Sequence, residues 1–329
     1  MKEFKNFGII ISGQPRSGKS TLANIFSKNS KFNVLKTDVL FIKHLKNKNF
    51  FFNHTIRIKN FLNSFRYQDF EKKEKRYVRE DISVNEKKLI DYVKKKKIIS
   101  HCELITTILE AWNHLKKKKI WVAPDLNAEI YLPKLIKIKP NIKFIFVFRN
   151  PIESIVASLY WRKNRINFTN LTLVKLIIRW NLTFYLAHRL KKKYGSNVAI
   201  IFFENLKRNK SINLEEIQLI NHKIKFPYDK DKTFFSYNVK KGWYTPKKKW
   251  EILINNLQLD LIKFGILSCR YRKNINFNFV SFCYLFLIYT ISFLFIFLAS
   301  INLNIYKQSV DFLFSPIKSI KNLILRYSK

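Results

Sequence analysis

Cysteine, histidine and acidic residues are all scarce in this chain of 329 residues. Its three cysteines, Cys102, Cys269 and Cys283, are far apart in the sequence, and its six histidines are scattered. Neither set has the spacing of a structural zinc site, and an odd number of cysteines does not indicate a disulfide framework. This usage is typical of a protein from a reducing compartment, and we expect no metal site.

The shortage of acidic residues leaves a large positive charge. There are 63 Lys and Arg residues against 22 Asp and Glu residues, and the formal net charge is +41 at pH 7. Such a charge usually indicates a nucleic-acid or anionic-surface partner. Lys, Asn, Ile and Phe are overused together, however, as AT-rich codons produce, and we attribute most of the basicity to this bias. We therefore expect no nucleic-acid partner, while the remaining positive field favours an anionic cofactor, an acidic acceptor or anionic membrane lipids.

Charged residues are absent from one long segment near the end of the chain. From Asn274 to Tyr306 there is no Asp, Glu, Lys or Arg, and the stretch 279–301 is nearly all apolar. A membrane span needs about 20 apolar residues, so we predict a transmembrane helix over 279–301, with a buried core helix as the alternative. The chain would then divide into a domain over 1–270 and a membrane-anchoring segment over 271–329 that ends in a basic amphipathic tail.

The flanking charges predict an orientation for this helix. Arg270, Arg272 and Lys273 precede the apolar stretch and follow a very basic domain, and the positive-inside rule keeps such a region in the cytoplasm. Because only Met1 to Lys5 precede the first apolar run, we expect neither a signal peptide nor an N-terminal anchor. The predicted location is the membrane, spanned once near the C-terminus, with the larger domain cytoplasmic.

Residues 13–21 have the composition of a loop that binds phosphate or sulfate groups. They follow an apolar run, Phe7 to Ile11, and precede a helical stretch, Leu22 to Phe26. The glycines of such a loop let its N–H groups point inward, and the helix N-terminus adds partial positive charge. The spacing Gly-x4-Gly-Lys-Ser also satisfies the nucleotide-binding P-loop pattern. We therefore predict an α/β fold of the P-loop type, with three α/β/α layers around a central parallel sheet.

A second strand indicates what kind of P-loop protein this is. The run Lys143 to Phe148 is typical of a buried strand in a parallel sheet. A magnesium-dependent NTPase often ends such a strand with Asp, which helps to hold the metal. Here Arg149, Asn150 and Pro151 follow instead, and a cation at that place suits a second anionic group. Pro151 can begin the next helix.

With these motifs in this order, the chain resembles the sulfotransferases that use 3′-phosphoadenosine 5′-phosphosulfate. Residues 14–20 resemble their 5′-phosphosulfate loop, and the segment from Arg149 to Ser158 resembles their 3′-phosphate motif. The run-up over 121–145 is similar to that of the family, as is the strand that ends at 202–206. The resemblance covers roughly Phe7 to Gly265.

The resemblance implies transfer of a sulfuryl group from this donor to a hydroxyl acceptor such as a sugar, a lipid or a glycan precursor, with no metal required. It implies that the donor is held by Gly13, Pro15, Arg16, Ser17, Gly18, Lys19, Ser20, Thr21, Arg149 and Ser158. Lys19 also has a catalytic role in this scheme, because it can neutralise charge on the leaving phosphate.

The chain departs from the family at two of these positions. Lys19 stands where the family usually has Thr, and lysine is the choice of kinases. The serine that normally lies eight residues after the arginine is Ala157 here, so either Ser154 or Ser158 is left to contact the 3′-phosphate. Ser154 and Ser158 are four residues apart and lie on one face of the expected helix.

The catalytic base has three candidates. Asp38 follows the second apolar segment, where many P-loop group-transfer enzymes place a carboxylate near the acceptor, and related sulfotransferases resemble this with a Glu. His101 and Glu103 follow a short strand-like run over 98–100 and remain alternatives. Asp38 is our assignment, although an Asp at that position also suits a helix N-cap.

Two other function classes stay open. A P-loop small-molecule kinase using Mg-ATP would explain Lys19 and Asp38, but it conflicts with the strand that ends in Arg149, and Asp125 is a poor replacement metal ligand. A non-catalytic basic protein that binds membranes or nucleic acid would leave both phosphate motifs unexplained.

Overall fold

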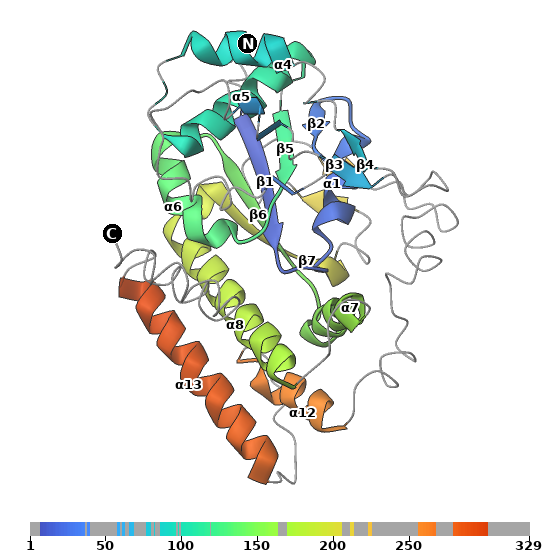
Figure 1. Cartoon of the computed structure of the whole chain (residues 1–329), viewed down its shortest axis with the longest axis vertical. Coiled ribbons are helices and arrows are strands. Elements are labelled where there is room, and N and C mark those ends of the chain that lie inside the picture. The colour runs from blue at the N-terminus through green and yellow to red at the C-terminus, as the bar shows by residue number, and fades with distance from the viewer. Residues whose placement is uncertain are drawn as a thin grey trace, which may run out of the picture. The chain divides into compact units, whose positions relative to one another are not determined.

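The structure is a computed structural model of the whole chain (Figure 1). It describes residues 7–36, 38–39, 58–59, 61–62, 66–68, 77–79, 82, 86–96, 98, 100–118, 120–163, 170–205, 211–213, 223–225, 256–267 and 279–301. The predicted basic tail after residue 301 lies outside these residues. The chain forms two compact units, one made of Met1–Phe148 with Leu190–Pro227 and the other of Arg149–Arg189 with Tyr228–Lys329. The division predicted at residue 270 is a different partition and stays a prediction.

The first unit is built on a parallel sheet of five strands in the order β2-β5-β1-β6-β7. The strands are β1 (Phe7–Gly13), β2 (Phe32–Val34), β5 (Ile120–Pro124), β6 (Lys143–Phe148) and β7 (Val198–Phe202). Every residue of β5 and all but the first of β6 are buried, as expected for strands covered on both faces. The predicted α/β fold with a central parallel sheet is confirmed.

The sheet register brings the ends of its three middle strands to one edge. Ile11 of β1 pairs with Pro124 of β5, and Gly13 pairs with Val147 of β6. Parallel α/β sheets bind their ligands at the carboxyl ends of the strands, where loops leave the sheet. The phosphate-binding loop leaves β1 at this edge. Two short hairpins pair β3 (Arg66–Gln68) with β4 (Tyr77–Arg79), and β8 (Ser211–Asn213) with β9 (Lys223–Lys225).

Three helices of the first unit, α1, α5 and α6, pack on the sheet, and a fourth, α4, packs on α5. Their bounds are α1 (Lys19–Ser27), α4 (Glu86–Lys94), α5 (His101–Leu115) and α6 (Ala128–Ile138), and a short 3-10 turn lies at Gly195–Asn197. In α1 the buried apolar side chains are Leu22, Ala23 and Phe26, which recur at helical spacing. The third layer of the predicted α/β/α arrangement is not tested, because the other long helices belong to the second unit.

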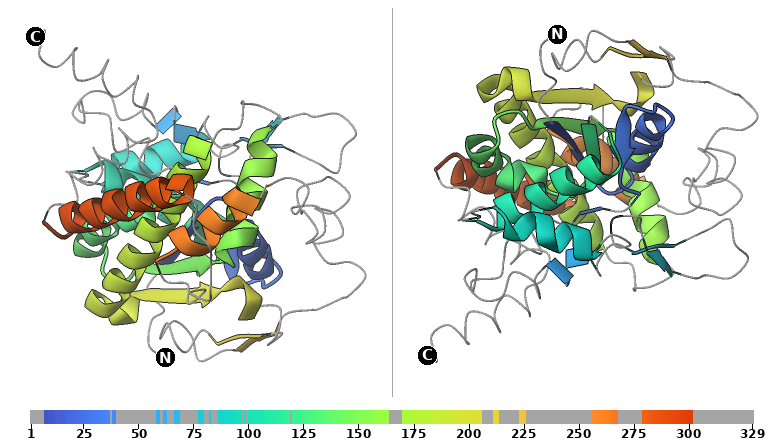
Figure 2. Two further views of the ribbon diagram at one scale, coloured as in Figure 1. Left: turned by 90° about the horizontal axis from the view of Figure 1, so that it is seen from below. Right: turned by 90° about the horizontal axis from the view of Figure 1, so that it is seen from above.

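The second unit contains the helices α7 (Pro151–Lys163), α12 (Asn256–Gly265), α13 (Phe279–Ile301) and most of α8 (Asn170–Lys193). Asn181 of α8 ties three of them together. Its side-chain amide donates to the Gly265 carbonyl at 2.8 Å and to Ser292 Oγ at 3.4 Å, and its side-chain oxygen accepts from the Leu267 N–H at 3.0 Å. Helix α13 therefore runs along α8 and α12 (Figure 2).

The uncharged stretch over 279–301 forms one helix, but the prediction that it spans a membrane is corrected. Among the described residues, no helix has the length and apolar character that a membrane span requires. The physical reason for the different outcome is that one face of α13 is used inside the protein. Ile288 and Ser292 are fully buried, and the Tyr289 hydroxyl donates to the Phe264 carbonyl of α12 at 2.5 Å. The predicted single-pass topology falls with the span, and the predicted cytoplasmic placement stays a prediction.

A glycine in β1 makes room for the largest side chain of the sheet. Gly8 pairs with Trp121 of β5, and a Cβ atom on Gly8 would lie 1.9 Å from the indole ring of this tryptophan. Trp121 is fully buried, so the ring has nowhere to move. We expect Gly8→Ala to lower the free energy of unfolding by about 1–3 kcal/mol through overpacking. Chemical denaturation measures this, with Gly195→Ala as the control, since no atom lies within 4 Å of a Cβ there. Equal stability of the two variants would contradict the packing argument.

Candidate functional site

The loop between β1 and α1 adopts a conformation that requires glycine at both ends. Gly13 has φ +145° and Gly18 has φ +102°, in the region that disfavours other residues. A Cβ atom on Gly13 would lie 2.3 Å from the Val147 carbonyl oxygen, and one on Gly18 would lie 2.4 Å from the Phe203 ring. The loop after β1 is therefore tight, as the sequence predicts. Its backbone conformation requires the two glycines, and it packs closely against the ends of β6 and β7.

The loop closes on itself through its backbone. The Ser17 N–H donates to the Gln14 carbonyl at 3.2 Å, and Lys19 Nζ donates to the same carbonyl at 3.4 Å. Lys19 is only 6% exposed, so its charge is held close to the loop. Arg16, which lies between Gln14 and Ser17 in the loop, has φ +66°. This arrangement turns the chain around the start of α1.

Among the loop residues, Ser17 gives the clearest evidence for a bound ligand. It is 1% exposed, and its hydroxyl has no hydrogen-bond partner within the part of the chain that the structure describes. A buried hydroxyl without a partner is costly, and an anionic oxygen bound in the loop would supply one. The Ser17 hydroxyl is therefore suited to donate a hydrogen bond to the phosphate or sulfate group that the sequence predicts.

The N-terminus of α1 adds positive potential to the same place. Gly18, its N-cap residue, has no side chain to cap the helix, and the first turn contains no acidic residue. The first helix-type bond is the Leu22 N–H to the Gly18 carbonyl at 3.0 Å. The N–H groups of Ser20 and Thr21 lie in the first turn, before this bond, and the N-terminal end of the helix attracts an anion.

Asp38 lies at the carboxyl edge of the same sheet. The segment after β2 follows the neighbouring strand, because the Leu35 N–H donates to the Val122 carbonyl and the Val39 N–H donates to the Pro124 carbonyl, both at 2.9 Å. Asp38 is half-buried. The structure thus places the predicted base beside the end of β5, which is itself next to β1.

A second carboxylate at this edge was considered in the sequence only as a metal ligand. Asp125 directly follows β5, and its N–H donates to the Ile11 carbonyl of β1 at 2.8 Å. Its side chain is fully buried and accepts a short hydrogen bond from the Tyr131 hydroxyl of α6. Tyr131 lies six residues later at a helical position, and no sequence motif links the two residues. The signal that was available is the position of Asp125 directly after a buried strand.

The Tyr131 hydroxyl stays protonated next to Asp125. Burial is the main cause that raises the pKa of Tyr131 well above its ordinary value of 10.0, and the negative charge of Asp125 adds to it. The neutral phenol is therefore the form that the folded protein stabilises, and it serves as a permanent donor to the carboxylate.

This pair predicts a pH effect on stability. Because the folded-state pKa of Tyr131 is raised, its contribution is fully present below about pH 10 and is lost as the pH rises toward the folded-state pKa. We expect Tyr131→Phe to destabilise the protein by about 1–3 kcal/mol at neutral pH, since Asp125 loses a donor, and the difference from wild type to shrink above about pH 10. Urea unfolding at a series of pH values measures this, with the exposed Tyr185→Phe as control. A difference that stayed constant across the alkaline range would contradict the assignment.

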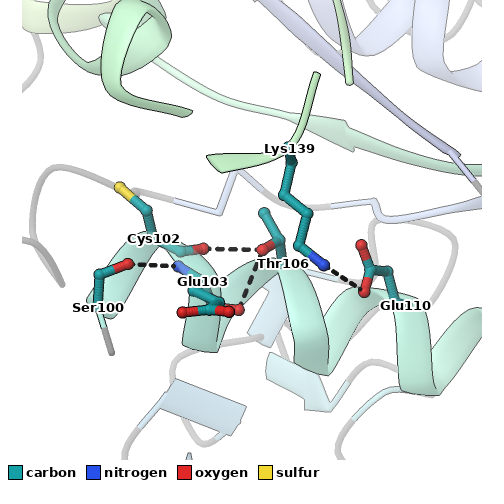
Figure 3. Close-up of polar contacts among 6 residues, drawn as sticks. All are labelled: Ser100, Cys102, Glu103, Thr106, Glu110 and Lys139. Carbon is teal, nitrogen blue, oxygen red and sulfur yellow. Dashed lines mark hydrogen bonds and ion pairs between the residues drawn. The ribbon is translucent and has the colours of Figure 1, made fainter. Parts of the chain in front are cut away.

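The two alternative bases, His101 and Glu103, lie at the start of α5. Figure 3 shows Glu103 with its neighbours on this helix. Ser100 is the N-cap residue of this helix, and its Oγ accepts from the Glu103 N–H at 3.2 Å. The Glu103 carbonyl in turn accepts from Thr106 Oγ1 at 3.0 Å, and Glu110 further along pairs with Lys139 at 3.0 Å. The backbone of Glu103 thus has a helix-starting role, while the side chain of His101 lies outside what the structure describes.

Arg149 opens the second unit directly after β6. Its Nε and Nη2 atoms donate to Glu153 Oε2 at 2.9 and 2.5 Å. Asn150 caps α7, because its side-chain oxygen accepts from the N–H groups of Ile152 and Glu153 at 3.0 and 3.4 Å. The sequence named Asn150 as part of the motif after the strand but gave it no capping role, and it did not single out Glu153; Asn before Pro is a helix-start signal. Together they hold the start of α7 and the guanidinium in a defined orientation.

The two candidate serines are both buried in α7. Ser154 is 2% exposed and Ser158 is 5% exposed. Ser158 Oγ donates to the Ser154 carbonyl at 2.8 Å, which is a common use of serine inside a helix. The predicted contact of either serine with a 3′-phosphate stays a prediction.

Comparison with known proteins adds a separate line of support. The model of the sulfotransferase family matches residues 8–219. The chain belongs to the sulfotransferase family. This family match contains the loop, Asp38, Asp125 and Arg149, and it confirms the resemblance noted in the sequence.

Among solved structures, the chain is similar to sulfotransferase STF9 from Mycobacterium avium. The identity is 10% and the TM-score is 0.36, over 65% of this chain and 62% of that chain. No curated protein sequence matches the chain. Within the described residues there is no group of three or more His, Cys, Asp and Glu side chains that could hold a metal ion.

Proposed function

We propose that this chain transfers a sulfuryl group from 3′-phosphoadenosine 5′-phosphosulfate to a hydroxyl acceptor, such as a sugar, a lipid or a glycan precursor. The observation that carries the proposal is the loop after β1. The Ser17 hydroxyl, which has no partner among the described residues, the buried Lys19 ammonium and the positive N-terminus of α1 all favour an anionic group there. Membership of the sulfotransferase family supports this use of the loop.

The residue after β6 supports this donor over ATP. Arg149 puts a guanidinium at a strand end where a magnesium-dependent NTPase often has a carboxylate. A guanidinium binds phosphate through paired hydrogen bonds, so it suits the 3′-phosphate that ATP lacks. In this proposal Glu153 orients the guanidinium, and Ser154 or Ser158 completes the 3′-phosphate site.

The reaction requires one bond to form and one to break. The acceptor oxygen attacks sulfur while the bond between sulfur and the bridging phosphate oxygen breaks, and 3′,5′-adenosine bisphosphate leaves. Lys19 and the N–H groups of the loop neutralise the charge that grows on the leaving phosphate, and Ser20 and Thr21 can donate further hydrogen bonds. Positioning and electrostatic stabilisation account for most of the rate in such a transfer.

Asp38 is the proposed acceptor of the proton that the hydroxyl loses. It is half-buried and lies at the sheet edge beside the end of β5. Asp125 lies at the same edge, but it is fully buried and engaged by Tyr131, so we assign it a role in holding the start of α6. Glu103 and His101 remain the alternatives to Asp38.

A small-molecule kinase is the second candidate because Lys19 is the lysine of a nucleotide-binding P-loop. Such an enzyme would need a magnesium ligand near the loop, and Asp125 is the carboxylate directly after β5, the strand next to β1. Its complete burial and its bond to Tyr131 argue against that use. The kinase therefore ranks below the sulfotransferase.

Ligand-dependent melting of the full chain tests the choice. A ligand that binds only the folded state stabilises it by about 2.7 kcal/mol at 100 times its dissociation constant. We expect 3′,5′-adenosine bisphosphate to raise the melting temperature without added metal, and Mg·ATP at the same concentration to have a smaller effect. A larger shift with Mg·ATP would overturn the proposal in favour of the kinase.

A further inference from the structure

Helix α13 has two faces of different exposure. Its inner face packs within the second unit through Leu285, Ile288, Ser292 and Phe295, whose exposed fractions are 6%, 0%, 0% and 8%. These residues recur at spacings of three and four, so they form one stripe along the helix. Two hydrogen bonds fix this stripe, one from the Asn181 amide to Ser292 Oγ and one from the Tyr289 hydroxyl to the Phe264 carbonyl.

The opposite face of α13 exposes large apolar side chains. We call it the α13 outer face, and it consists of Phe286 (64% exposed), Leu287 (40%), Phe293 (60%), Leu294 (51%) and Phe297 (61%). Spacings of three, four and seven residues place all five on one side of the helix. Five of the eight exposed large apolar side chains among the described residues thus lie on one helix.

A contiguous exposed apolar stripe of this kind marks a surface that meets an apolar partner. Single exposed leucines or tyrosines need no such explanation, but three phenylalanines and two leucines in one line do. Thr290 and Cys283 are also exposed on this helix, and α13 contains no charged residue. The partner therefore contacts α13 through an apolar region, and any charges of the partner lie outside that contact.

The charge of the chain identifies the class of this partner. A second copy of the chain would carry the same net charge of +41, and two such surfaces repel each other. A membrane surface with anionic lipids has the complementary charge and an apolar interior next to it. In the sequence the uncharged helix is bracketed by Arg270, Arg272 and Lys273 before it and Lys307 after it. The sequence therefore carries positive charge on both sides of the apolar helix, which suits an anionic surface.

We propose that α13 docks the protein on an anionic membrane surface, with the helix in the plane of the interface and its outer face inserted among the lipids. The inner face stays on α8 and α12, which is why the helix lies along the membrane in this proposal and does not cross it. Phenylalanine and leucine on one side of a helix are the residues that bind at this depth. The proposal does not depend on the proposed enzymatic activity.

Vesicle binding of the purified full chain tests the docking. Sucrose-loaded vesicles of phosphatidylcholine, with and without phosphatidylglycerol, are sedimented with the protein at low and high salt. We expect sedimentation with the anionic vesicles and weaker sedimentation at high salt. The triple variant Phe286→Ser, Phe293→Ser, Phe297→Ser should lose at least about a hundredfold in partition, because three buried rings no longer contribute. The matched control is Leu115→Ser with Tyr185→Ser, which removes exposed apolar side chains outside α13 and should bind like wild type.

A gentler pair of variants guards against misfolding of the triple variant. Thr290 lies among the outer-face residues and is exposed, so a charge there should not disturb the fold. We expect Thr290→Glu to weaken binding to anionic vesicles and Thr290→Lys to preserve it. A fluorophore on the exposed Cys283, in a Cys269→Ser background, should shift to the blue when vesicles are added, because it would enter an apolar medium.

Three results would overturn the proposal. Absence of vesicle binding by the wild type would do so, as would equal binding by the triple variant and the wild type. The third is a concentration-dependent dimer in sedimentation velocity without lipid that the outer-face variants convert to a monomer. That result would assign the α13 outer face to a second copy of the chain.

Discussion

Replacing Arg149 with alanine is expected to weaken the binding of 3′,5′-adenosine bisphosphate by about 100-fold, because hydrogen bonds to charged groups contribute about 1.5–3 kcal/mol each. The loss has a second cause. Glu153 now engages the guanidinium through Nε and Nη2, and without Arg149 its carboxylate would stand unpaired next to the proposed 3′-phosphate position. The negative charges of the Glu153 carboxylate and the 3′-phosphate would repel each other and oppose binding.

Isothermal titration with two ligands isolates this contact. The bisphosphate should bind the wild type much more tightly than adenosine 5′-monophosphate does, because only the bisphosphate has the 3′-phosphate. In Arg149→Ala the preference should nearly disappear, while binding of the monophosphate changes little. Arg189→Ala, which removes an exposed arginine from the same unit, is the charge-matched control. If Arg149→Ala weakened both ligands equally, Arg149 would be a general electrostatic or structural residue and the 3′-phosphate assignment would fail.

Replacing Lys19 with alanine is expected to lower the turnover number by about 100- to 1,000-fold, the loss typical when one donor to a developing charge is removed. Lys19 is held next to the loop by the Gln14 carbonyl, and the charge on the leaving phosphate grows as the sulfur–oxygen bond breaks. The ammonium therefore contributes more in the transition state than in the bound ground state, and turnover should fall more than affinity for the donor.

The acceptor is not needed in pure form for this test. Transfer of radiolabelled sulfur from the donor into the lipid and glycan fractions of a cell extract measures turnover directly. The control is Lys28→Ala, an exposed lysine at the other end of the same helix, which should retain wild-type activity. Turnover by Lys19→Ala within a few-fold of the wild type would remove Lys19 from the catalytic scheme and leave it with a packing role.

The phosphate-binding loop is the part of the site that local sequence predicts best. The apolar run before it, the glycines at 13 and 18 and the helical stretch after it all act over short distances along the chain, so the pattern carries the conformation. The structure places that loop between β1 and α1, with both glycines at positive φ. The close approach of Gly18 to Phe203 could not be predicted from the sequence, because that contact joins residues far apart along the chain.

The carboxylates at the sheet edge show the limit of local patterns more clearly. Asp38 could be chosen because it follows a strand-like segment. Asp125 had the same local signal, yet its pairing with Tyr131 depends on how α6 leaves the sheet and on burial of the whole pair. Burial depends on how the whole chain packs, so a short stretch of sequence does not show which residues are buried. The structure is therefore what separates the half-buried Asp38 from the fully buried Asp125.

Helix α13 gives the same lesson about apolar composition. The absence of charge over 279–301 predicts a helix that avoids water, and a helix is what forms. Composition alone cannot distinguish a helix that is apolar all round from one that buries a single face, because both read as an uninterrupted apolar run. Contacts with α8 and α12 decide the matter, since they enclose Ser292 and leave Phe286, Phe293 and Phe297 exposed.

The sequence by itself thus determined the parallel α/β fold, the phosphate-binding loop, the arginine after β6 and the family. Each of these rests on the order of short motifs, whose conformations are set by neighbours along the chain. The tertiary structure alone decided the strand order, the enclosure of Asp125 by Tyr131, the pairing of Arg149 with Glu153 and the two faces of α13. These features depend on which side chains are shielded from water, and shielding arises only when distant segments pack together.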